Sequence, residues 1–520
     1  MAAASSPLLA ADDPKRVVVA LGAGGEKVFK LDGEEVVLMG GNYVFKTQPY
    51  FPPREVVSAN AKQMSDGARS MSYTPPPAAD GSPRSVKACV RLGCMLEGAM
   101  PNKAGSVDPT WAANLDATIE AFAEQGVYVF LEVHMDAFST TNGGDGFPWW
   151  IGDYMQSNIK SDSASGHCCC FGSPSYIVNP ENPMTLVFPS WLACCCCIRG
   201  VQTEGNNPWA AYAIGTGLGN PAAMNVGNLS VRLNNNDSAW QAGTLTWITQ
   251  VHNYAARFYQ SASTSDREAI FEPYCQHIRY LCRKWEQHWN VVAVELLNEP
   301  VLGGLPSLRQ YFTNRRNLFD LYAGVLEELG QSEPPIRTPL ALQDGFGSLA
   351  RASCLMKLLS CIPISSKAQQ QLREWGEKCQ LILSIHWYPG LGCLSHNTTI
   401  LPKAFIAMAK EESRDLMASS PLWLSEFYLP SVSEGLAFFA NAGLPAMTYW
   451  QYVDTEYTQT GGWFKYPPSV TQYGEPITTD GTVNAEAWAA YEKTVADGSY
   501  WGGMVCGGAN GQNDVLSKVK

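Results

Sequence analysis

Apolar, β-branched runs alternate with stretches of helical periodicity along most of this chain. Strands that are buried on both faces read as continuous apolar runs, whereas helices show apolar residues three and four positions apart. The apolar runs predict strands at residues 36–44, 87–96, 127–133, 291–297, 339–343, 381–385, 421–425 and 446–451. Helical periodicity falls at residues 110–125, 265–288, 308–329, 369–378 and 402–418. Eight βα units of this kind predict an α/β fold, the (β/α)8 TIM barrel.

Two interruptions of this rhythm define the predicted domain organisation. We expect a single barrel domain over residues 36–500, an N-terminal extension over residues 1–35 that leads into it, and a Gly-rich C-terminal tail over residues 501–520. Insertions are predicted at about 64–83, which is proline-rich, and at about 140–263, after the third strand. A loop as long as the second is usually functional in a compact domain, so we expect it to shape specificity.

Composition narrows the class of protein. A chain of 520 residues with 46% hydrophobic and 16% charged residues predicts a globular enzyme. The net charge of −12 and the lack of a Lys/Arg run argue against nucleic acid or an anionic membrane as partner, so a neutral substrate fits better. No apolar stretch reaches the roughly 20 residues that span a bilayer. Asp12 and Asp13 interrupt the short apolar N-terminus, so a cytoplasmic protein is expected, with secretion as the alternative.

The second insertion carries two cysteine runs, at residues 168–170 and 194–197. They lack the spaced pairs of a zinc site, and adjacent cysteines cannot all form unstrained disulfides. We interpret them as reduced cysteines in a tolerant loop. Palmitoylation is an alternative that would bring this aromatic-rich insertion into peripheral contact with a membrane, and disulfide or metal use is another.

Two carboxylates, Glu299 and Glu426, end two separate apolar strand-like runs. In a TIM barrel the C-terminal ends of all strands meet at one face, where the chemistry takes place. Retaining glycosidases need one carboxylic acid to protonate the leaving oxygen and one carboxylate to attack the anomeric carbon. A structural ion pair is the alternative for either residue alone. Asn298 can hold a sugar hydroxyl and Pro300 turns the chain away, which favours the catalytic interpretation.

The other predicted strands end in polar or aromatic residues. These are Asn42, Arg91, His134, Asp136, Gln343, Asp344, His386, Tyr388 and Trp450. Buried core imidazoles and a packing tryptophan are the alternatives for the histidines and Trp450. The histidines lack the spacing of a ligand set, and residues 21–25 complete neither a dinucleotide nor a phosphate-loop motif. We therefore predict no metal and no cofactor.

With Val-Arg-Leu-Gly, Leu-Leu-Asn-Glu-Pro, His-Trp-Tyr and Leu-Ser-Glu-Phe in this order, the chain resembles glycoside hydrolase family 5, a cellulase-like TIM-barrel family. The resemblance implies Glu299 as acid/base at the end of the fourth strand and Glu426 as nucleophile at the end of the seventh. It implies that Arg91 keeps the nucleophile ionised. The further substrate-binding residues that it implies are His134, Asn298, His386, Tyr388 and Trp450.

Residues 86–150 show a finer resemblance. Gly-Val-Tyr-Val-Phe-Leu-Glu-Val-His-Met-Asp-Ala-Phe-Ser and Gly-Asp-Gly-Phe-Pro-Trp-Trp are similar to the endoglycoceramidase-related branch of the family, which implies a glucosylated lipid as substrate and Asp136 as a glycone-binding residue. Ser-Glu-Phe-Tyr around Glu426 replaces the branch's usual Gly-Glu-Phe-Gly. Three functions remain open: a retaining β-glycosidase of a glycosphingolipid or steryl glucoside, an endo-β-1,4-glucanase or β-mannanase, and a non-catalytic sugar-binding barrel.

Overall fold

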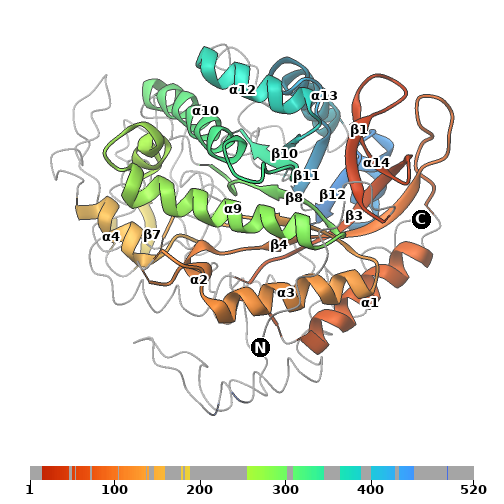
Figure 1. Cartoon of the computed structure of the whole chain (residues 1–520). Helices are drawn as coiled ribbons and strands as arrows, with labels where there is room; N and C mark the ends of the chain where they lie inside the picture. The colour runs from red at the N-terminus through yellow and green to blue at the C-terminus, as the bar shows by residue number, and fades with distance from the viewer. Residues whose placement is uncertain are drawn as a thin grey trace.

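The computed structural model describes residues 15–45, 50–52, 54–70, 73–102, 105–135, 138–139, 146–157, 177–179, 182–187, 254–300, 308–344, 364–387, 400–427, 432–449, 486 and 489. Within these ranges eight parallel strands close into a barrel, in the order β3-β12-β11-β10-β9-β8-β5-β4, with β4 paired back to β3 (Figure 1). The predicted TIM barrel is confirmed.

Each predicted strand is present with slightly shifted ends. The barrel strands are β3 (Glu34–Tyr43), β4 (Ser85–Gly93), β5 (Tyr128–Glu132), β8 (Val291–Glu295), β9 (Leu340–Gln343), β10 (Leu381–Trp387), β11 (Leu422–Phe427) and β12 (Ala446–Tyr449). Apart from Glu34 and the first residues of β4, their residues are buried, which explains why they read as continuous apolar runs.

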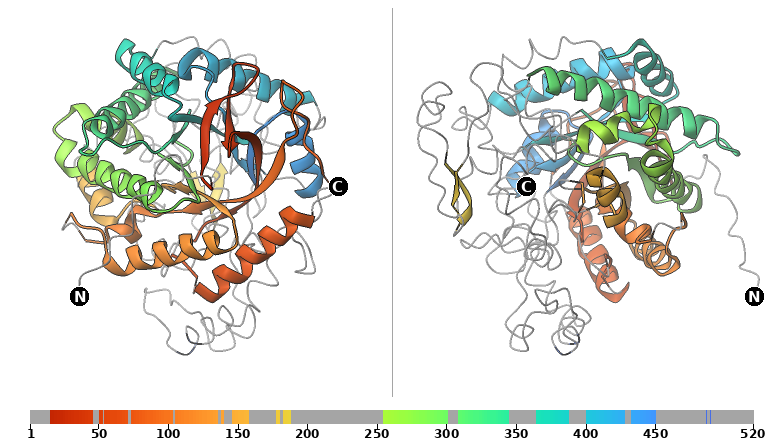
Figure 2. Two further views of the ribbon diagram at one scale, coloured as in Figure 1. Left: turned by 45° about the vertical axis from the view of Figure 1, so that its right-hand side comes forward. Right: turned by 90° about the vertical axis from the view of Figure 1, so that its left-hand side faces the viewer.

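A β-hairpin closes the N-terminal end of the barrel. Strands β1 (Val17–Leu21) and β2 (Lys27–Leu31) pair antiparallel, and β2 pairs antiparallel with the start of β3 (Figure 2). Phe29 of the hairpin meets Phe130 of β5 edge to face, with ring centroids 6.0 Å apart. Phe130 in turn stacks on Trp423 of β11 at 4.1 Å, across the barrel. The hairpin therefore packs Phe29 against the aromatic side chains inside this end of the barrel.

The helices pack around the barrel as an outer layer (Figure 2). They are α1 (Arg54–Ser70), α2 (Leu96–Ala99), α3 (Pro109–Glu124), α4 (Trp149–Ser157), α9 (Glu272–Gln287), α10 (Leu308–Gly330), α12 (Ser366–Glu377), α13 (Ile400–Met417) and α14 (Val432–Asn441). A short 3-10 turn, Ser261–Ser263, and a π-helical turn, Arg267–Phe271, precede α9. A small antiparallel pair, β6 (Ile177–Asn179) and β7 (Asn182–Val187), lies within the second insertion.

Local sequence fixes where these helices begin. The carboxylate of Asp108 accepts hydrogen bonds from the backbone amides of Thr110 and Trp111, so α3 starts at Pro109. The hydroxyl of Ser365 accepts from the amide of Ala368 and starts α12 three residues before the predicted position.

Part of the first predicted insertion is helical instead. Residues 64–70, assigned from sequence to the proline-rich insertion at 64–83, form the last turns of α1. Val57, Ala61 and Met64 recur at helical spacing and are all buried, so this stretch has an apolar face to pack. The proline run begins only after this helix has ended.

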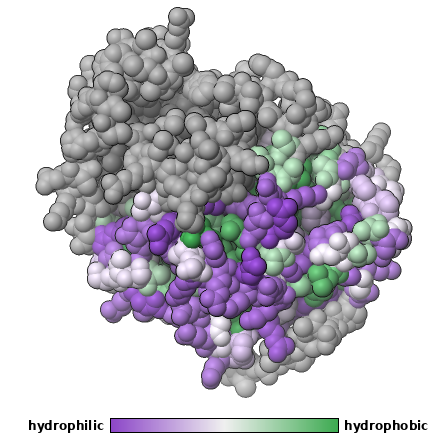
Figure 3. All heavy atoms as spheres, turned by 90° about the horizontal axis from the view of Figure 1, so that it is seen from above, coloured by the Kyte–Doolittle hydropathy of each residue, from purple (hydrophilic) through white to green (hydrophobic). Residues whose placement is uncertain are grey.

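The described surface is mainly polar. On the face shown in Figure 3, hydrophobic residues form only small separate groups among hydrophilic ones. Among the described residues, Leu21 and Trp149 are the large hydrophobic side chains that are exposed. No helix in the described part of the chain combines the length and the apolar character needed to cross a membrane.

Candidate functional site

A layer of polar side chains lies directly above the apolar layer of the barrel. Successive residues of a strand point to opposite faces, so residues two apart share a face. Six of the eight strands pass from an apolar to a polar inward residue in one such step: Cys89 to Arg91, Phe130 to Glu132, Ala293 to Glu295, Ala341 to Gln343, Ile382 to Ser384 and Trp423 to Ser425. The polar layer is therefore built by the strands themselves.

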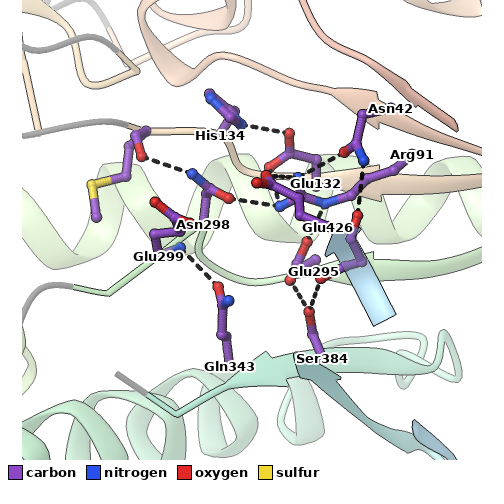
Figure 4. A network of polar contacts seen from close by, with 12 residues as sticks. Asn42, Arg91, Glu132, His134, Glu295, Asn298, Glu299, Gln343, Ser384 and Glu426 are labelled. Atoms are coloured by element: carbon purple, nitrogen blue, oxygen red, sulfur yellow. Dashed lines mark hydrogen bonds and ion pairs between the residues drawn. The ribbon is translucent and has the colours of Figure 1, made fainter. Parts of the chain in front are cut away.

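Arg91 stands at the centre of this layer and is fully buried. Its Nε donates to Glu295 Oε2 at 2.7 Å, and its Nη1 donates to Glu426 Oε1 at 2.5 Å. Nη2 donates to Asn298 Oδ1 at 2.8 Å and lies 3.1 Å from Glu132 Oε2 (Figure 4). One guanidinium thus holds three carboxylates that come from three different strands.

The two predicted catalytic glutamates face each other across His386. Glu299 Oε1 lies 2.8 Å from His386 Nδ1, and Glu426 Oε2 lies 3.4 Å from the same nitrogen. These three ligand-type atoms all lie within 4.8 Å of one another. Retaining glycosidases hold their two carboxyl groups about 5 Å apart, whereas inverting enzymes leave about 6.5 Å or more. Glu299 and Glu426 therefore bring carboxylate oxygens within 4.8 Å of each other, close enough for the first class.

The direction of the Glu299 side chain is set by an unusual backbone conformation. Its φ is +37°, in the left-handed region that non-glycine residues rarely adopt. The backbone amide of Glu299 donates to Gln343 Oε1 at 2.7 Å, which ties the turn to β9. The side chain of Glu299 is 12% exposed and that of Glu426 is 5% exposed, so Glu299 is the more accessible of the two carboxylates.

His134 and Asn298 complete the described part of the predicted site. His134 Nδ1 lies 2.7 Å from Glu132 Oε1. The Asn298 side chain donates to the carbonyl of Met135 at 3.1 Å, while its oxygen accepts from Arg91. Both side chains are buried, so the end of β5 and the turn after β8 are held against Arg91.

The electrostatics of the site are dominated by burial and by Arg91. Burial lowers the pKa of His386 to about 4 against the pull of Glu426, so its imidazole is neutral near pH 7. Burial opposes the charge of Arg91, but Glu132, Glu295 and Glu426 outweigh it and raise the pKa of the guanidinium. Burial raises the pKa of Glu295. For Glu132 burial acts in the same direction, but Arg91 and His134 outweigh it and lower the pKa.

The same three groups could hold a cation. Glu299, His386 and Glu426 offer two carboxylate oxygens and one imidazole nitrogen close together. Such a set suits borderline divalent ions. However, Glu426 already accepts from Arg91, whose positive charge lies beside the place that an ion would take. Glu299, His386 and Glu426 therefore fit a pair of reactive carboxylates with an imidazole between them better than a metal site.

Sequence reasoning missed the two structural carboxylates, Glu132 and Glu295. Each ends a fully buried strand whose other residues are almost all apolar. A charged residue in such a run needs a buried partner, and this was the available signal. The sequence identifies Asn42 only as a strand end. In the structure its amide donates to the carbonyls of Ser425, Thr448 and Tyr449, and its oxygen accepts from Arg91.

Six predicted site residues are brought together in the structure: Arg91, His134, Asn298, Glu299, His386 and Glu426. Three others, Asp136, Tyr388 and Trp450, lie outside the described residues. The two cysteine runs, at residues 168–170 and 194–197, also lie outside them.

The fold and this site define a TIM-barrel protein with a facing pair of carboxylates at the C-terminal ends of its strands. Residues 86–167 match the model of the cellulase family, glycosyl hydrolase family 5. This match confirms the resemblance to glycoside hydrolase family 5 for that part of the chain. Endoglycoceramidase I of Rhodococcus hoagii (strain 103S) is 30% identical over 137 residues, which is 26% of this chain. The match spans 24% of the length of that relative.

Solved structures of similar shape are more distant. Endo-glycoceramidase II from Rhodococcus sp. is 15% identical, over 88% of this chain and 79% of its own, with a TM-score of 0.48. An endogalactoceramidase is 14% identical, over 84% and 74% of the two chains, with a TM-score of 0.48. Sterylglucosidase 1 of Cryptococcus neoformans is 11% identical, over 85% and 77%, with a TM-score of 0.41.

Proposed function

We propose that this protein is a retaining β-glycosidase that works by double displacement. The observation that carries the proposal is the approach of Glu299, His386 and Glu426, whose facing atoms lie within 4.8 Å of one another. The family match over residues 86–167 supports it, because the matched segment includes Arg91 and His134.

In the first step Glu426 attacks the anomeric carbon while Glu299 gives its proton to the leaving glycosidic oxygen. The carbon–oxygen bond to the aglycone breaks and a glycosyl ester of Glu426 forms. In the second step Glu299 takes a proton from water, the water oxygen bonds to the anomeric carbon, and the Glu426 carboxylate leaves. Two inversions give net retention of the β configuration.

Arg91 and His386 serve this pair in different ways. Arg91 Nη1 donates to Glu426 Oε1, so its charge favours the ionised nucleophile. His386 is neutral and lies between both glutamates, so it orients them without adding charge. The proposed glycone-binding residues are Asn298, His134 and, beyond the described residues, Asp136, Tyr388 and Trp450.

As substrate we propose a glucosylated lipid, a glycosphingolipid or a steryl glucoside. The support is the 30% identity to an endoglycoceramidase over 137 residues. An endo-β-1,4-glucanase or β-mannanase is the second candidate, favoured by the cellulase description of the matching family model. A barrel that only binds sugar is the third, and it would leave the close approach of Glu299 and Glu426 without a use.

The experiment that separates these candidates is turnover by the purified protein of glucosylceramide, a steryl glucoside, cello-oligosaccharides and manno-oligosaccharides, with and without EDTA. We expect release of sugar from a glucosylated lipid, insensitive to EDTA, with the β anomer as first product in proton NMR. Cleavage of the oligosaccharides alone would support the second candidate. Binding without cleavage in all four cases, or an α anomer as first product, would refute the retaining mechanism.

A further inference from the structure

The buried cluster around Arg91 holds more negative than positive charge. Glu132, Glu295 and Glu426 all lie within 3.1 Å of one guanidinium and are almost completely buried. With all three carboxylates ionised, the four groups would carry a net charge of −2. Uncompensated charge is costly in a buried environment, and a carboxylate in that position takes up a proton instead.

The hydrogen bonds around Glu295 indicate which carboxylate carries the proton. Glu295 Oε1 is in hydrogen-bond contact with Ser384 Oγ. Ser384 Oγ lies 2.5 Å from Ser425 Oγ, and Ser425 Oγ donates to the carbonyl of Ile385 at 3.3 Å. This series of hydrogen bonds from Glu295 to Ile385 has three contacts, but the two serines supply only two hydroxyl hydrogens.

The carbonyl of Ile385, at the end of this series of hydrogen bonds, lies at an irregularity in the sheet. The pairing of β10 with β11 shifts register between Ile385 and His386, so that Ser425 is skipped. At this irregularity the carbonyl of Ile385 accepts a hydrogen bond from Ser425 Oγ. Either serine can donate in the contact between them. With the Ser425 hydroxyl donating to Ile385, the donor in that contact is Ser384. In this arrangement the remaining hydrogen, between Ser384 and Glu295, is supplied by a protonated Glu295.

The other two carboxylates have partners that suit the ionised form. Glu132 has Arg91 and the ring nitrogen of His134 beside it. Glu426 has Arg91 at 2.5 Å and must be ionised to act as the nucleophile. The pKa directions agree, because that of Glu132 is lowered and that of Glu295 is raised.

We propose that Glu295 is a neutral carboxylic acid in the resting protein, hydrogen-bonded to Ser384, and that it positions Arg91 for the nucleophile. A neutral acid still accepts a hydrogen bond from Arg91 Nε through Oε2. It therefore holds the guanidinium in place without forming an ion pair with it. The positive charge of Arg91 then stabilises the ionised forms of Glu132 and Glu426. Glu295 touches no substrate in this scheme and acts only through Arg91. The positioning role rests on the proposed function, whereas the protonation state does not.

The charged and titratable groups that act on Glu295 come from the strands around it. Arg91 of β4 favours its ionised form, while Glu132 of β5 opposes it. His386 of β10 also favours the ionised form. Glu426 of β11 shares Arg91 with it. Burial and Glu132 together outweigh Arg91, His386 and the hydrogen bond with Ser384, so the pKa of Glu295 is raised.

Infrared difference spectroscopy tests the protonation state without reference to activity. A protonated carboxylic acid absorbs at a higher C=O frequency than a carboxylate, and the band shifts in deuterium oxide. We expect the wild-type spectrum at pH 7 to show such a band that is lost in Glu295→Gln and kept in Glu35→Gln, which removes a buried carboxylate paired with Arg84 outside the cluster. In Ser384→Ala the band should shift to higher frequency, because the acid loses its hydrogen-bond acceptor. This last variant leaves the carboxyl group in place should Glu295→Gln fail to fold.

Kinetics test the positioning role. Removing an ionised carboxylate beside Arg91 favours ionisation of those that remain, so Glu132→Gln should move the acid limb of kcat/KM about one pH unit lower. Glu295→Gln replaces a neutral group by a neutral group and should leave that limb in place. Its kcat should also exceed that of Glu295→Ala by about tenfold, because the amide oxygen still accepts from Arg91.

The outcomes are distinct. A difference spectrum with only carboxylate bands, or an acid limb that moves as far in Glu295→Gln as in Glu132→Gln, overturns the proposal. A protein that shows the infrared band but cleaves no glycoside overturns the proposed function and the positioning role, and leaves the neutral Glu295 standing.

Discussion

Replacing Glu426 by alanine is the sharpest test of the proposed chemistry, because the structure predicts both the loss and its chemical repair. The substitution removes the carboxylate that attacks the sugar, and nucleophile removal in other hydrolases lowers kcat on the order of 10⁵-fold, about 7 kcal/mol in the barrier. Stability should fall much less. Breaking a buried ion pair costs about 3–5 kcal/mol when a charge is left alone. Here Arg91 keeps Glu132 and Glu295, so we expect a loss nearer 1–2 kcal/mol in the free energy of unfolding.

The space left by the carboxylate should accept a small anion beside Arg91. Azide there can attack the anomeric carbon from the face that Glu426 used, with a single inversion. Glu426→Ala should therefore regain turnover of an activated aryl β-glucoside in azide and release the α-glycosyl azide. Glu299→Ala should instead give the β-glycosyl azide, because Glu426 still forms the glycosyl ester and azide then replaces water.

The assay is aryl glucoside hydrolysis with NMR identification of the azide product. Glu35→Gln is the matched control, because Glu35 is a buried carboxylate paired with Arg84 at the opposite end of the barrel. We expect it to keep the wild-type rate and to give no azide product. A Glu426→Ala protein with the wild-type rate, or one that yields the β-glycosyl azide, would refute the nucleophile assignment.

Three further predictions follow from single residues. Glu299→Ala should lose far more activity on an alkyl glucoside than on an activated aryl glucoside, because the poorer leaving group needs the proton, and equal losses would contradict the acid role. Gly40→Ala should lower the free energy of unfolding by more than about 3 kcal/mol in thermal or urea unfolding, since its Cβ would lie 1.6 Å from the carbonyl oxygen of Cys89. Gly330→Ala is the control: the nearest atom to its Cβ would be 3.9 Å away, so its stability should stay close to that of the wild type. His277 is buried with its pKa lowered to about 4, so the unfolded chain binds its proton first and stability should fall by up to about 3 kcal/mol as the pH drops from 6.5 to 4. His277→Gln should remove this part of the slope in urea titrations at pH 4.5 and 7, and an unchanged slope would count against it.

The parts of the fold that sequence predicts well are those that burial decides. Each barrel strand is a short apolar run, and its buried residues explain why the pattern is continuous. The convergence of strand ends follows from the barrel itself, so Glu299 and Glu426 could be paired although 126 residues separate them. Helix α1 (Arg54–Ser70) is not among the helices that the sequence predicts. The proline-rich segment behind it suggests a loop, and the spacing of Val57, Ala61 and Met64 is weak evidence in so short a stretch.

The polar layer around Arg91 could not be predicted in the same way. Arg91 and Glu295 lie 204 residues apart, and their contact depends on the register of several strand pairs. Sequence shows that a buried charge needs a partner, but it does not say which residue supplies it. The register shift between Ile385 and His386 leaves no mark in the pattern of apolar positions, and neither does the contact between Ser384 and Ser425.

Strand register therefore decides the geometry of the proposed catalytic pair. A slip of one residue turns every side chain of a strand to the other face, and in β4 it would replace Arg91 inside the barrel by a neighbour. The stacking of Phe130 on Trp423 fixes β5 and β11 one layer below the polar residues. Glu132 is two residues beyond Phe130, and Ser425 is two residues beyond Trp423. Because that layer is apolar and closed by the hairpin of β1 and β2, it holds the register on which the contacts of Arg91 with Glu295 and Glu426 depend.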